Sequence, residues 1–188
     1  MQHNLPFDPS LDDSITQALQ QRCKKYFERT DFYAEYLSLS ELKQLVPTLV
    51  AQLQKLDINL DMAGFMCTPP GVDGTIHIDG DPEYPKYWAL NLPIYNCHNT
   101  AMTWWHCTSE SKIIQSKHLY QNTPIRQFDK KDCKEIERCV LNQATWVNVG
   151  VPHSVENLAN TANRMILTLR FDVSKLQDWH PDMLKRQH

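Results

Sequence analysis

The stretch Ile76-His77-Ile78-Asp79 places a histidine and an aspartate two positions apart, each beside an isoleucine. Side chains alternate between the two faces of an extended strand, so His77 and Asp79 share one face and the isoleucines share the other. An imidazole and a carboxylate on one face are two of the three ligands of a facial metal site, which binds iron(II) through two histidines and one carboxylate. The third ligand must then come from a distant part of the chain.

His153 is the candidate for that third ligand. It lies in Gly150-Val-Pro-His-Ser-Val155, at the expected start of a late strand, and Arg164 opens the next apolar strand. Two imidazoles and one carboxylate leave coordination positions open on iron, which suits O2 and a bidentate co-substrate. Arginine binds a carboxylate through a fork of two hydrogen bonds. Arg164 is therefore the predicted anchor of an acidic co-substrate, and Arg170, on the same strand face, is the alternative.

The ordered set His77-x-Asp79, His153 and Arg164 resembles the motif of the 2-oxoglutarate-dependent non-haem iron(II) dioxygenases. The resemblance covers about residues 58–173. Within this superfamily the chain looks nearest to small bacterial and phage proteins of the aspartyl/asparaginyl β-hydroxylase group. The resemblance implies a double-stranded β-helix, with iron(II), 2-oxoglutarate and O2 as metal, co-substrate and oxidant. It assigns the metal to His77, Asp79 and His153, and the distal carboxylate of 2-oxoglutarate to Arg164.

Two further stretches, Ala89–Cys97 and Thr100–Trp105, resemble the region that follows HxD in those proteins. Polar side chains from these middle strands are expected to line the co-substrate pocket, and aromatic ones to form its walls, although aromatic residues on strands more often belong to the core. The predicted co-substrate contacts are Asn91, Tyr95 and Thr103, and the predicted walls are Trp88, Trp104 and Trp105.

The presence of Asp79 also bears on the type of reaction. Aspartyl β-hydroxylases can lack this carboxylate, and halogenases replace it with a small residue, so Asp79 favours an ordinary hydroxylase. The implied activity is hydroxylation of a small-molecule or peptide substrate, with succinate and CO2 as co-products. Two alternatives stay open. One is a cupin-type metal enzyme that does not use 2-oxoglutarate, although cupins usually start with HxH and add a later glutamate. The other is a non-catalytic β-barrel binding protein.

The cysteines suggest a second, competing metal site. Cys97-His98 and His106-Cys107 flank a predicted hairpin, and thiolate and imidazole ligands suit zinc. Their spacing is not that of a zinc finger, so a simple hairpin is the preferred interpretation. The chain is large enough to fold without disulfides and has no CxxC pair, so mostly reduced thiols are expected. The six cysteines are Cys23, Cys67, Cys97, Cys107, Cys133 and Cys139.

The elements that must position these residues begin with a helical segment. Apolar residues recur every fourth position over residues 10–29, which predicts an amphipathic helix. Ser38-Leu-Ser-Glu41 has the capping-box pattern that opens a second helix, and Pro47 either kinks this helix or starts a new one. Residues 1–57 are therefore predicted to form a helical addition to the domain.

Beyond residue 57 the apolar period shortens toward two, and Pro, Gly, Asn and Asp separate short apolar runs. Seven short strands without regular helices between them predict a mainly β fold, a sandwich or cupin-like jelly roll, with the helices packed on one sheet. The core is expected to span residues 58–173, and 174–188 to form a tail or short helix. Residues 109–139 are polar and predict a loop, an edge strand and a short helix. The strands are expected at Ile58–Cys67, Thr75–Asp79, Lys86–Tyr95, Met102–Cys107, Ala144–Val149, Pro152–Glu156 and Arg164–Val173.

Charge and composition narrow the range of partners. The net charge is -3, from 19 basic and 22 acidic residues, and neither sign forms a long run, which disfavours nucleic acid. No segment approaches the ~18 apolar residues of a membrane span, and the N-terminus lacks a basic and then apolar signal, so a soluble cytoplasmic protein is expected. The nucleotide-binding patterns GxGxxG and GxxxxGKS/T are absent from the sequence.

Overall fold

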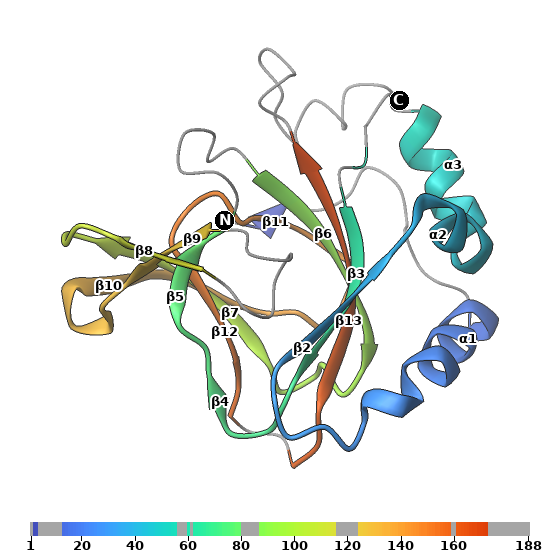
Figure 1. Cartoon of the computed structure of the whole chain (residues 1–188), viewed down its shortest axis with the longest axis horizontal. Coiled ribbons are helices and arrows are strands. Elements are labelled where there is room, and N and C mark those ends of the chain that lie inside the picture. Colours follow the sequence, from blue (N-terminus) through green and yellow to red (C-terminus); the bar gives the residue numbers. More distant parts are fainter. Residues whose placement is uncertain are drawn as a thin grey trace.

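A computed structural model describes residues 2–3, 13–55, 60, 62–79, 87–115, 124–158 and 161–172. Its core consists of two antiparallel sheets that enclose a common interior (Figure 1). In spatial order the first sheet contains β1 (Gln2–His3), β11 (Thr145–Asn148), β6 (Tyr87–Tyr95), β13 (Arg164–Asp172), β3 (Met62–Thr68) and β2 (Tyr33–Leu37). The second contains β10 (Cys133–Val140), β7 (Ala101–Cys107), β12 (His153–Asn157), β5 (Ile76–Ile78), β9 (Pro124–Phe128) and β8 (Lys112–Gln115), and β4 (Val72–Asp73) pairs with β12. The predicted mainly β, jelly-roll class is confirmed.

Strands form in all seven places where the sequence predicts them. In β13 the side chains alternate between two buried environments, as a period of two predicts. Alternate residues of this strand pack in the apolar cluster beneath the helices: Met165, Leu167, Leu169 and Phe171. The residues between them point to the other face, toward the second sheet, because strand side chains alternate. Arg164, Ile166 and Arg170 on that face line an internal cavity. One strand thus contributes to the core on one side and to the candidate site on the other.

The helices lie together outside the first sheet (Figure 1). They are α1 (Asp13–Cys23), the 3-10 turn η1 (Lys24–Tyr26), α2 (Leu39–Leu45) and α3 (Pro47–Lys55). The predicted capping box is confirmed, since the Ser38 hydroxyl accepts from the Glu41 backbone N–H and the Glu41 carboxylate accepts from the Ser38 backbone N–H. Pro47 was predicted either to kink the second helix or to start a new one, and it starts a new helix. None of the helices in the described part of the chain is long and apolar enough to cross a membrane.

The N-terminal region also contributes strands, which the sequence did not predict. β2 lies between η1 and α2 and pairs with β3 at the edge of the first sheet, and β1 pairs with β11 at the other edge. Residues 1–57 are therefore more than a helical addition. The domain limits at 57 and 173 stay predictions, and residues 10–12 and 174–188, where a helix start and a tail were expected, lie outside the described residues.

The polar region 109–139 differs from its prediction. A loop, one edge strand and a short helix were expected, and the structure has three strands there, β8, β9 and β10. The short 3-10 helix η2 (Lys130–Asp132) lies between β9 and β10, and residues 116–123 lie outside the described residues. β10 and β8 are the outermost strands of the second sheet, so much of their surface meets solvent. Edge strands of this kind carry charged side chains and lack the apolar alternation that reveals a buried strand.

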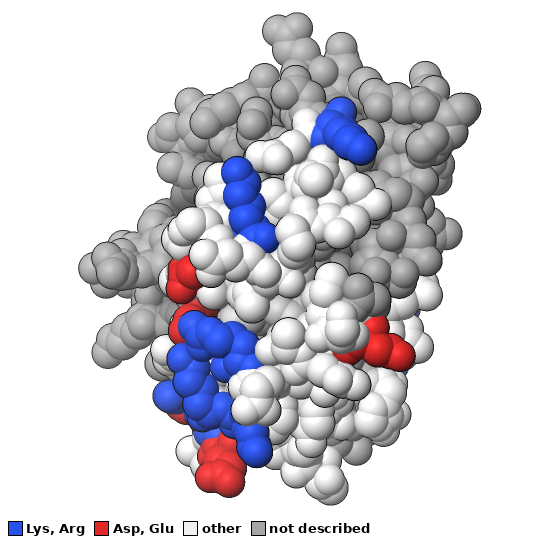
Figure 2. Space-filling model, turned by 90° about the vertical axis from the view of Figure 1, so that its right-hand side faces the viewer, with Lys and Arg blue, Asp and Glu red and all other residues white. Residues whose placement is uncertain are grey.

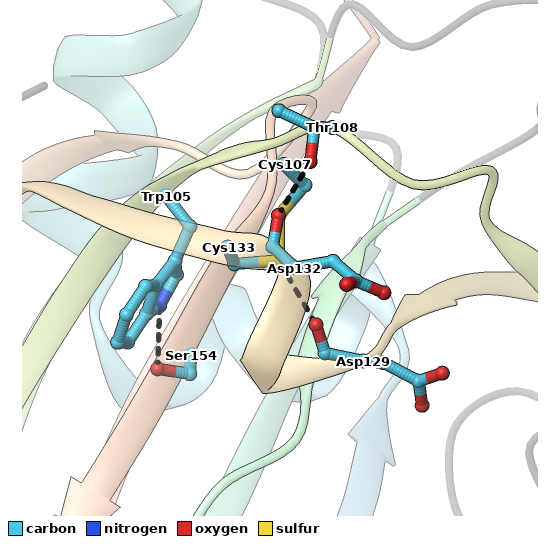
Figure 3. Close-up of a disulfide and its surroundings, with 7 residues drawn as sticks. All are labelled: Trp105, Cys107, Thr108, Asp129, Asp132, Cys133 and Ser154. Atoms are coloured by element: carbon cyan, nitrogen blue, oxygen red, sulfur yellow. Dashed lines mark hydrogen bonds between the residues drawn. A yellow bond between two sulfur atoms is a disulfide. The ribbon is translucent and has the colours of Figure 1, made fainter.

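A disulfide joins two of these strands. Cys107 on β7 and Cys133 on β10 stand opposite each other in the register, with Cα atoms 4.1 Å apart (Figure 3). The other four cysteines are free thiols, so the expectation of mostly reduced cysteines holds for those four and is wrong for this pair. The pairing depends on the register of β10, a strand that the sequence did not reveal. The zinc interpretation is also overturned, because it required a free Cys107 thiolate.

The side of the molecule that carries the helices has a mixed charge. Figure 2 shows basic side chains gathered in one area with acidic ones at its border. Arg22 and Lys25 both pair with Glu35, at 2.6 and 3.2 Å, and Arg29 pairs with Asp31 at 2.9 Å. These ion pairs offset much of the positive charge locally, so the region is a poor footprint for a phosphate backbone.

Candidate active site

The structure brings His77, Asp79 and His153 together at the interior face of the second sheet. One potential ligand atom from each residue lies within 4.8 Å of the others. His77 and His153 stand directly opposite each other on β5 and β12, and their ring centroids are 4.5 Å apart. Asp79 follows β5, with Oδ1 3.4 Å from His77 Nε2 and Oδ2 3.8 Å from His153 Nε2. Among the described residues this is the one group of histidine, cysteine and carboxylate side chains with metal-ligand spacing.

Each histidine is oriented by its own strand. His77 Nδ1 lies 2.8 Å from the carbonyl oxygen of Thr75, and His153 Nδ1 lies 2.9 Å from that of Val151. A carbonyl oxygen can only accept, so both Nδ1 atoms carry the ring hydrogen and donate it. The Nε2 atoms, which face Asp79, are therefore left with a free lone pair. A hydrogen bond from the second ring nitrogen is the usual way in which proteins orient a metal-binding imidazole.

Burial keeps both imidazoles in the form that binds metal. Burial lowers the pKa of His77, and it lowers the pKa of His153 well below the usual value, with a further contribution from the neighbouring His77. Both rings are therefore neutral at physiological pH. A neutral imidazole is the ligand form, because a protonated ring has no lone pair to donate.

Arg170 forms a buried ion pair with Asp79, in which Nη1 donates to Oδ2. Burial lowers the pKa of Arg170 to about 10, which still leaves the guanidinium charged at neutral pH. A buried carboxylate needs such a partner, since an unpaired charge in the interior is costly. Arg170 was the alternative anchor for the co-substrate in the sequence, and the structure places it on the aspartate of the triad instead.

Arg164 is the second buried cation of the interior. It is 1% exposed, and its Nε and Nη2 atoms have no hydrogen-bond partner within the described structure. Burial lowers its pKa, while the nearby Cys97 thiol raises it by charge interaction and hydrogen bonding. Buried polar groups are nearly always paired, so two unpaired guanidinium nitrogens on an arginine that lines a cavity indicate a missing anionic partner. The carboxylate of a dicarboxylic acid fits this requirement through a two-pronged contact.

A single cavity of about 510 Å³ connects these groups. His77, His153, Arg164 and Arg170 all line it, and Asn91 reaches it from the interior face of β6. The volume falls in the range of about 300–1,000 Å³ that is common for small-molecule sites. The two histidines of the metal-binding group and Arg164 therefore line the same space.

The other predicted pocket residues lie elsewhere. The pairing of β6 with β13 shifts between Met165 and Ile166, and Tyr95 stands opposite Met165, on the helix side of the sheet. There its ring stacks on Phe27 at 4.3 Å. Such a bulge reverses which face a side chain takes, and period two alone does not reveal it. Thr103 alternates with the cavity residue Met102, so its side chain takes the opposite strand face.

The three tryptophans are likewise not among the described lining residues of the cavity. Trp88 packs in the helix-side cluster, while Trp104 is buried in the interior and donates from its indole to the Asn148 carbonyl at 2.8 Å. The Trp105 indole donates to the Ser154 hydroxyl at 3.0 Å (Figure 3). The sequence did not identify several apolar residues that do line the cavity, because apolar strand residues look the same whether they fill a core or face a pocket: Phe32, Met66, Ile114 and Ile125.

Gly74 brings the two histidine-bearing strands close together. Its backbone N–H donates to the Val155 carbonyl at 3.0 Å, where the chain between β4 and β5 runs against β12. A Cβ atom at this position would lie 2.2 Å from the same oxygen, so no side chain fits. Close approach of two backbones is a common reason for glycine within a strand region.

Comparison with known proteins shows the fold. The structure is similar to HygX from Streptomyces hygroscopicus with nickel and 2-oxoglutarate bound, with a TM-score of 0.52 and 8% identity over 93% of this chain and 84% of that one. Apo HygX gives a TM-score of 0.50 and 7% identity over 92% and 83% of the two chains. A Pseudomonas putida prolyl-4-hydroxylase is 14% identical over 92% and 91%, with a TM-score of 0.46. No protein-family model and no curated protein matches the chain.

The fold and the site together define a jelly-roll protein with a facial group of two histidines and one carboxylate at its interior. HygX shares this fold and was solved with iron, and with nickel and 2-oxoglutarate. The expected proximity to the aspartyl/asparaginyl β-hydroxylase group stays a prediction.

Proposed function

We propose that this protein is an iron(II)- and 2-oxoglutarate-dependent oxygenase that hydroxylates a small-molecule or peptide substrate. The observation that carries the proposal is that Arg164, which has two buried guanidinium nitrogens without a partner, lines the same cavity as His77 and His153. A metal-binding triad alone would fit several classes of enzyme. A triad that shares a cavity with a free carboxylate-binding group supports a metal and an acidic co-substrate used together.

The roles of the residues follow from their positions. His77 and His153 hold the metal through Nε2, and Asp79 supplies the carboxylate ligand. Arg164 binds the distal carboxylate of 2-oxoglutarate, and the Asn91 amide lies in the same cavity to hydrogen-bond the co-substrate. Iron(II), together with 2-oxoglutarate and O2, supplies the oxidising chemistry and yields succinate and CO2 as co-products.

The rest of the site prepares these groups for binding. Arg170 holds Asp79 in place and offsets its charge in the interior. The backbone carbonyls of Thr75 and Val151 fix the ring orientation of the two histidines. Little rearrangement is therefore needed for the three side chains to bind a metal, which favours tight binding.

Both alternatives fit these observations less well. In a cupin-type enzyme that does not use 2-oxoglutarate, the buried guanidinium of Arg164 would have no anionic ligand to bind. A non-catalytic binding protein would have no need for two neutral histidines aligned on a carboxylate. Location in the cytoplasm stays a prediction, and the Cys107–Cys133 disulfide counts against it, because disulfides are rare in that compartment.

The test measures succinate formation by purified protein with iron(II), 2-oxoglutarate and ascorbate. Slow turnover without a prime substrate is expected for the wild type and is expected to vanish in Asp79→Ala. Asp73→Ala is the matched control, because Asp73 also lines the cavity but is outside the metal-binding group. Calorimetry with manganese(II) and 2-oxoglutarate gives a second readout. A wild-type protein that binds neither the metal nor 2-oxoglutarate would refute the proposal.

A further inference from the structure

The cavity extends beyond the groups assigned to the metal and the co-substrate. Its remaining walls are mainly apolar and come from both sheets, the β8–β9 hairpin and the segment before β2. Among the described residues the apolar lining consists of Phe32, Met66, Val72, Met102, Ile114, Ile125, Val149, Val155 and Ile166. Threonine side chains and Gly74 account for most of the rest. The described walls of the space left for a substrate are therefore largely hydrocarbon.

Each charged side chain described in the lining already has a partner or a role. Arg170 is paired with Asp79, and Arg164 is assigned to the co-substrate. The Asp73 carboxylate accepts from Lys130 Nζ at 2.6 Å. No cation in this described lining is left over for a carboxylate or phosphate on the substrate. Against this described lining such a group would meet apolar side chains and no counter-charge, which is strongly unfavourable.

The β8–β9 hairpin places part of this apolar wall on the same face as a metal ligand. Gln127 stands opposite His77 in the pairing of β9 with β5, so the two side chains share a face. Ile125 lies two residues from Gln127 and therefore has the same orientation, and Ile114 is its partner on β8. Both isoleucines line the cavity. Ile113 points to the opposite face of the hairpin and is 62% exposed.

Building on the proposed function, we infer that the prime substrate presents an uncharged hydrocarbon group to the metal centre, held against the wall that includes Ile114 and Ile125. In the reaction one oxygen atom of O2 enters a C–H bond of this group and gives an alcohol. The second oxygen atom enters succinate as 2-oxoglutarate loses CO2. O2 takes up four electrons, two from this oxidation of 2-oxoglutarate and two from the C–H bond that becomes the alcohol. Free amino acids, nucleotides and phosphorylated compounds are poor candidates for the part of the substrate that enters the cavity.

The first test compares octan-1-ol with octanoate, which have the same chain length and differ in charge. Both compete with the uncharged fluorescent probe N-phenyl-1-naphthylamine on protein loaded with manganese(II) and 2-oxoglutarate. Octan-1-ol is expected to bind at least about tenfold more tightly, because the octanoate carboxylate finds no free cation among the described lining residues. Equal or tighter binding of octanoate would overturn the inference.

The second test uses a matched pair of variants on one strand. Ile114→Ala removes hydrocarbon from the cavity wall and is expected to weaken octan-1-ol binding by roughly fivefold to tenfold. Ile113→Ala removes the same atoms from the exposed face and should leave binding unchanged. Circular dichroism and the melting temperature show that both variants are folded. The inference fails if the two variants bind octan-1-ol equally well.

The two proposals can fail separately. Binding of manganese(II) and 2-oxoglutarate is measured by calorimetry on the same wild-type protein and variants. If neither binds, the proposed function itself is wrong. If both bind and octan-1-ol shows no preference over octanoate, the oxygenase assignment stands and only the apolar substrate class is refuted.

Discussion

The Arg170 guanidinium donates to Oδ2 of Asp79, the carboxylate that lies between the two histidines of the candidate metal centre. The ion pair crosses from the first sheet to the second, because Arg170 is on β13 and Asp79 follows β5. A residue outside the metal-binding group thus determines where one of its ligands stands. Hydrogen-bonding partners of this kind orient a ligand and raise its affinity for metal.

Arg170→Met removes the partner of Asp79 without removing the side chain's apolar bulk. Metal affinity is expected to fall by about 10–100-fold, the usual effect of losing a group that supports a ligand. The metal-free protein is expected to lose about 3–5 kcal/mol of unfolding free energy, because Asp79 is left buried and unpaired. Manganese(II) calorimetry and urea denaturation measure the two effects.

The control for this variant is Arg138→Met. Arg138 pairs with Glu156 on the surface, where an ion pair contributes at most about 1 kcal/mol. Its loss should not change metal affinity. An Arg170→Met protein that binds manganese(II) as tightly as wild type would show that Asp79 needs no support from this arginine.

Arg164 is expected to control affinity for 2-oxoglutarate and not for metal. Arg164→Lys keeps the charge but loses the fork that binds both carboxylate oxygens, so 2-oxoglutarate affinity should fall by about tenfold or more. Arg164→Met should weaken it further, because the charge is also lost. Calorimetric titration of 2-oxoglutarate into manganese-loaded protein tests this order. A loss of metal affinity equal to the loss of 2-oxoglutarate affinity would indicate a general collapse of the site.

The metal-free protein is expected to become less stable as the pH falls below about 6.5, the ordinary histidine value. His77 and His153 have lowered pKa values in the folded state. As the pH falls, these two side chains therefore become protonated in the unfolded chain before they do in the folded protein. The free energy of unfolding contributed by these groups is present above that pH and is lost on acidification.

Urea denaturation from pH 5 to 8 in the presence of a chelator measures this slope. The double variant His77→Gln, His153→Gln should flatten it, whereas His106→Gln, which changes an exposed residue of β7, should leave it intact. A wild-type slope that is unchanged in the double variant would assign the acid sensitivity to other groups.

The Cys107–Cys133 disulfide is expected to support stability but not metal binding. Replacing both cysteines with serine should lower the unfolding free energy by about 2–4 kcal/mol and leave manganese(II) affinity unchanged. Thiol titration of the denatured protein should find four free thiols before reduction and six after it. Cys139→Ser, on the same strand as Cys133, is the control that removes a free thiol. Six free thiols in unreduced protein would contradict the disulfide.

The part of the site that the sequence could predict is the part that strand geometry determines. His77 and Asp79 share a face because strand side chains alternate. The buried strand that contains Arg164 is predicted by its run of apolar residues. The partner of Asp79 could not be derived in this way. Arg170 is far from Asp79 along the chain, and only the packing of one sheet on the other joins them.

The errors have equally physical causes. The sequence predicted one edge strand in residues 109–139, where the structure has β8, β9 and β10. The outermost two, β8 and β10, lack the apolar alternation of a buried strand, and the disulfide on β10 was missed for the same reason. Tyr95, an expected co-substrate contact, lies on the helix side of the sheet because a bulge reverses the alternation near the end of β6. The period of apolar residues predicts which face of a continuous strand is buried. It does not predict register shifts or contacts between sheets.

Gly74 acts as a spacer that sets the separation of the two histidines. The Cβ of any other residue would collide with the Val155 carbonyl and push β12 away from the strand that carries His77. The first effect of such a change would be a wider gap between the two imidazoles. If every residue of the chain were substituted in turn, substitutions of Gly74 would then be as damaging as substitutions of the metal ligands.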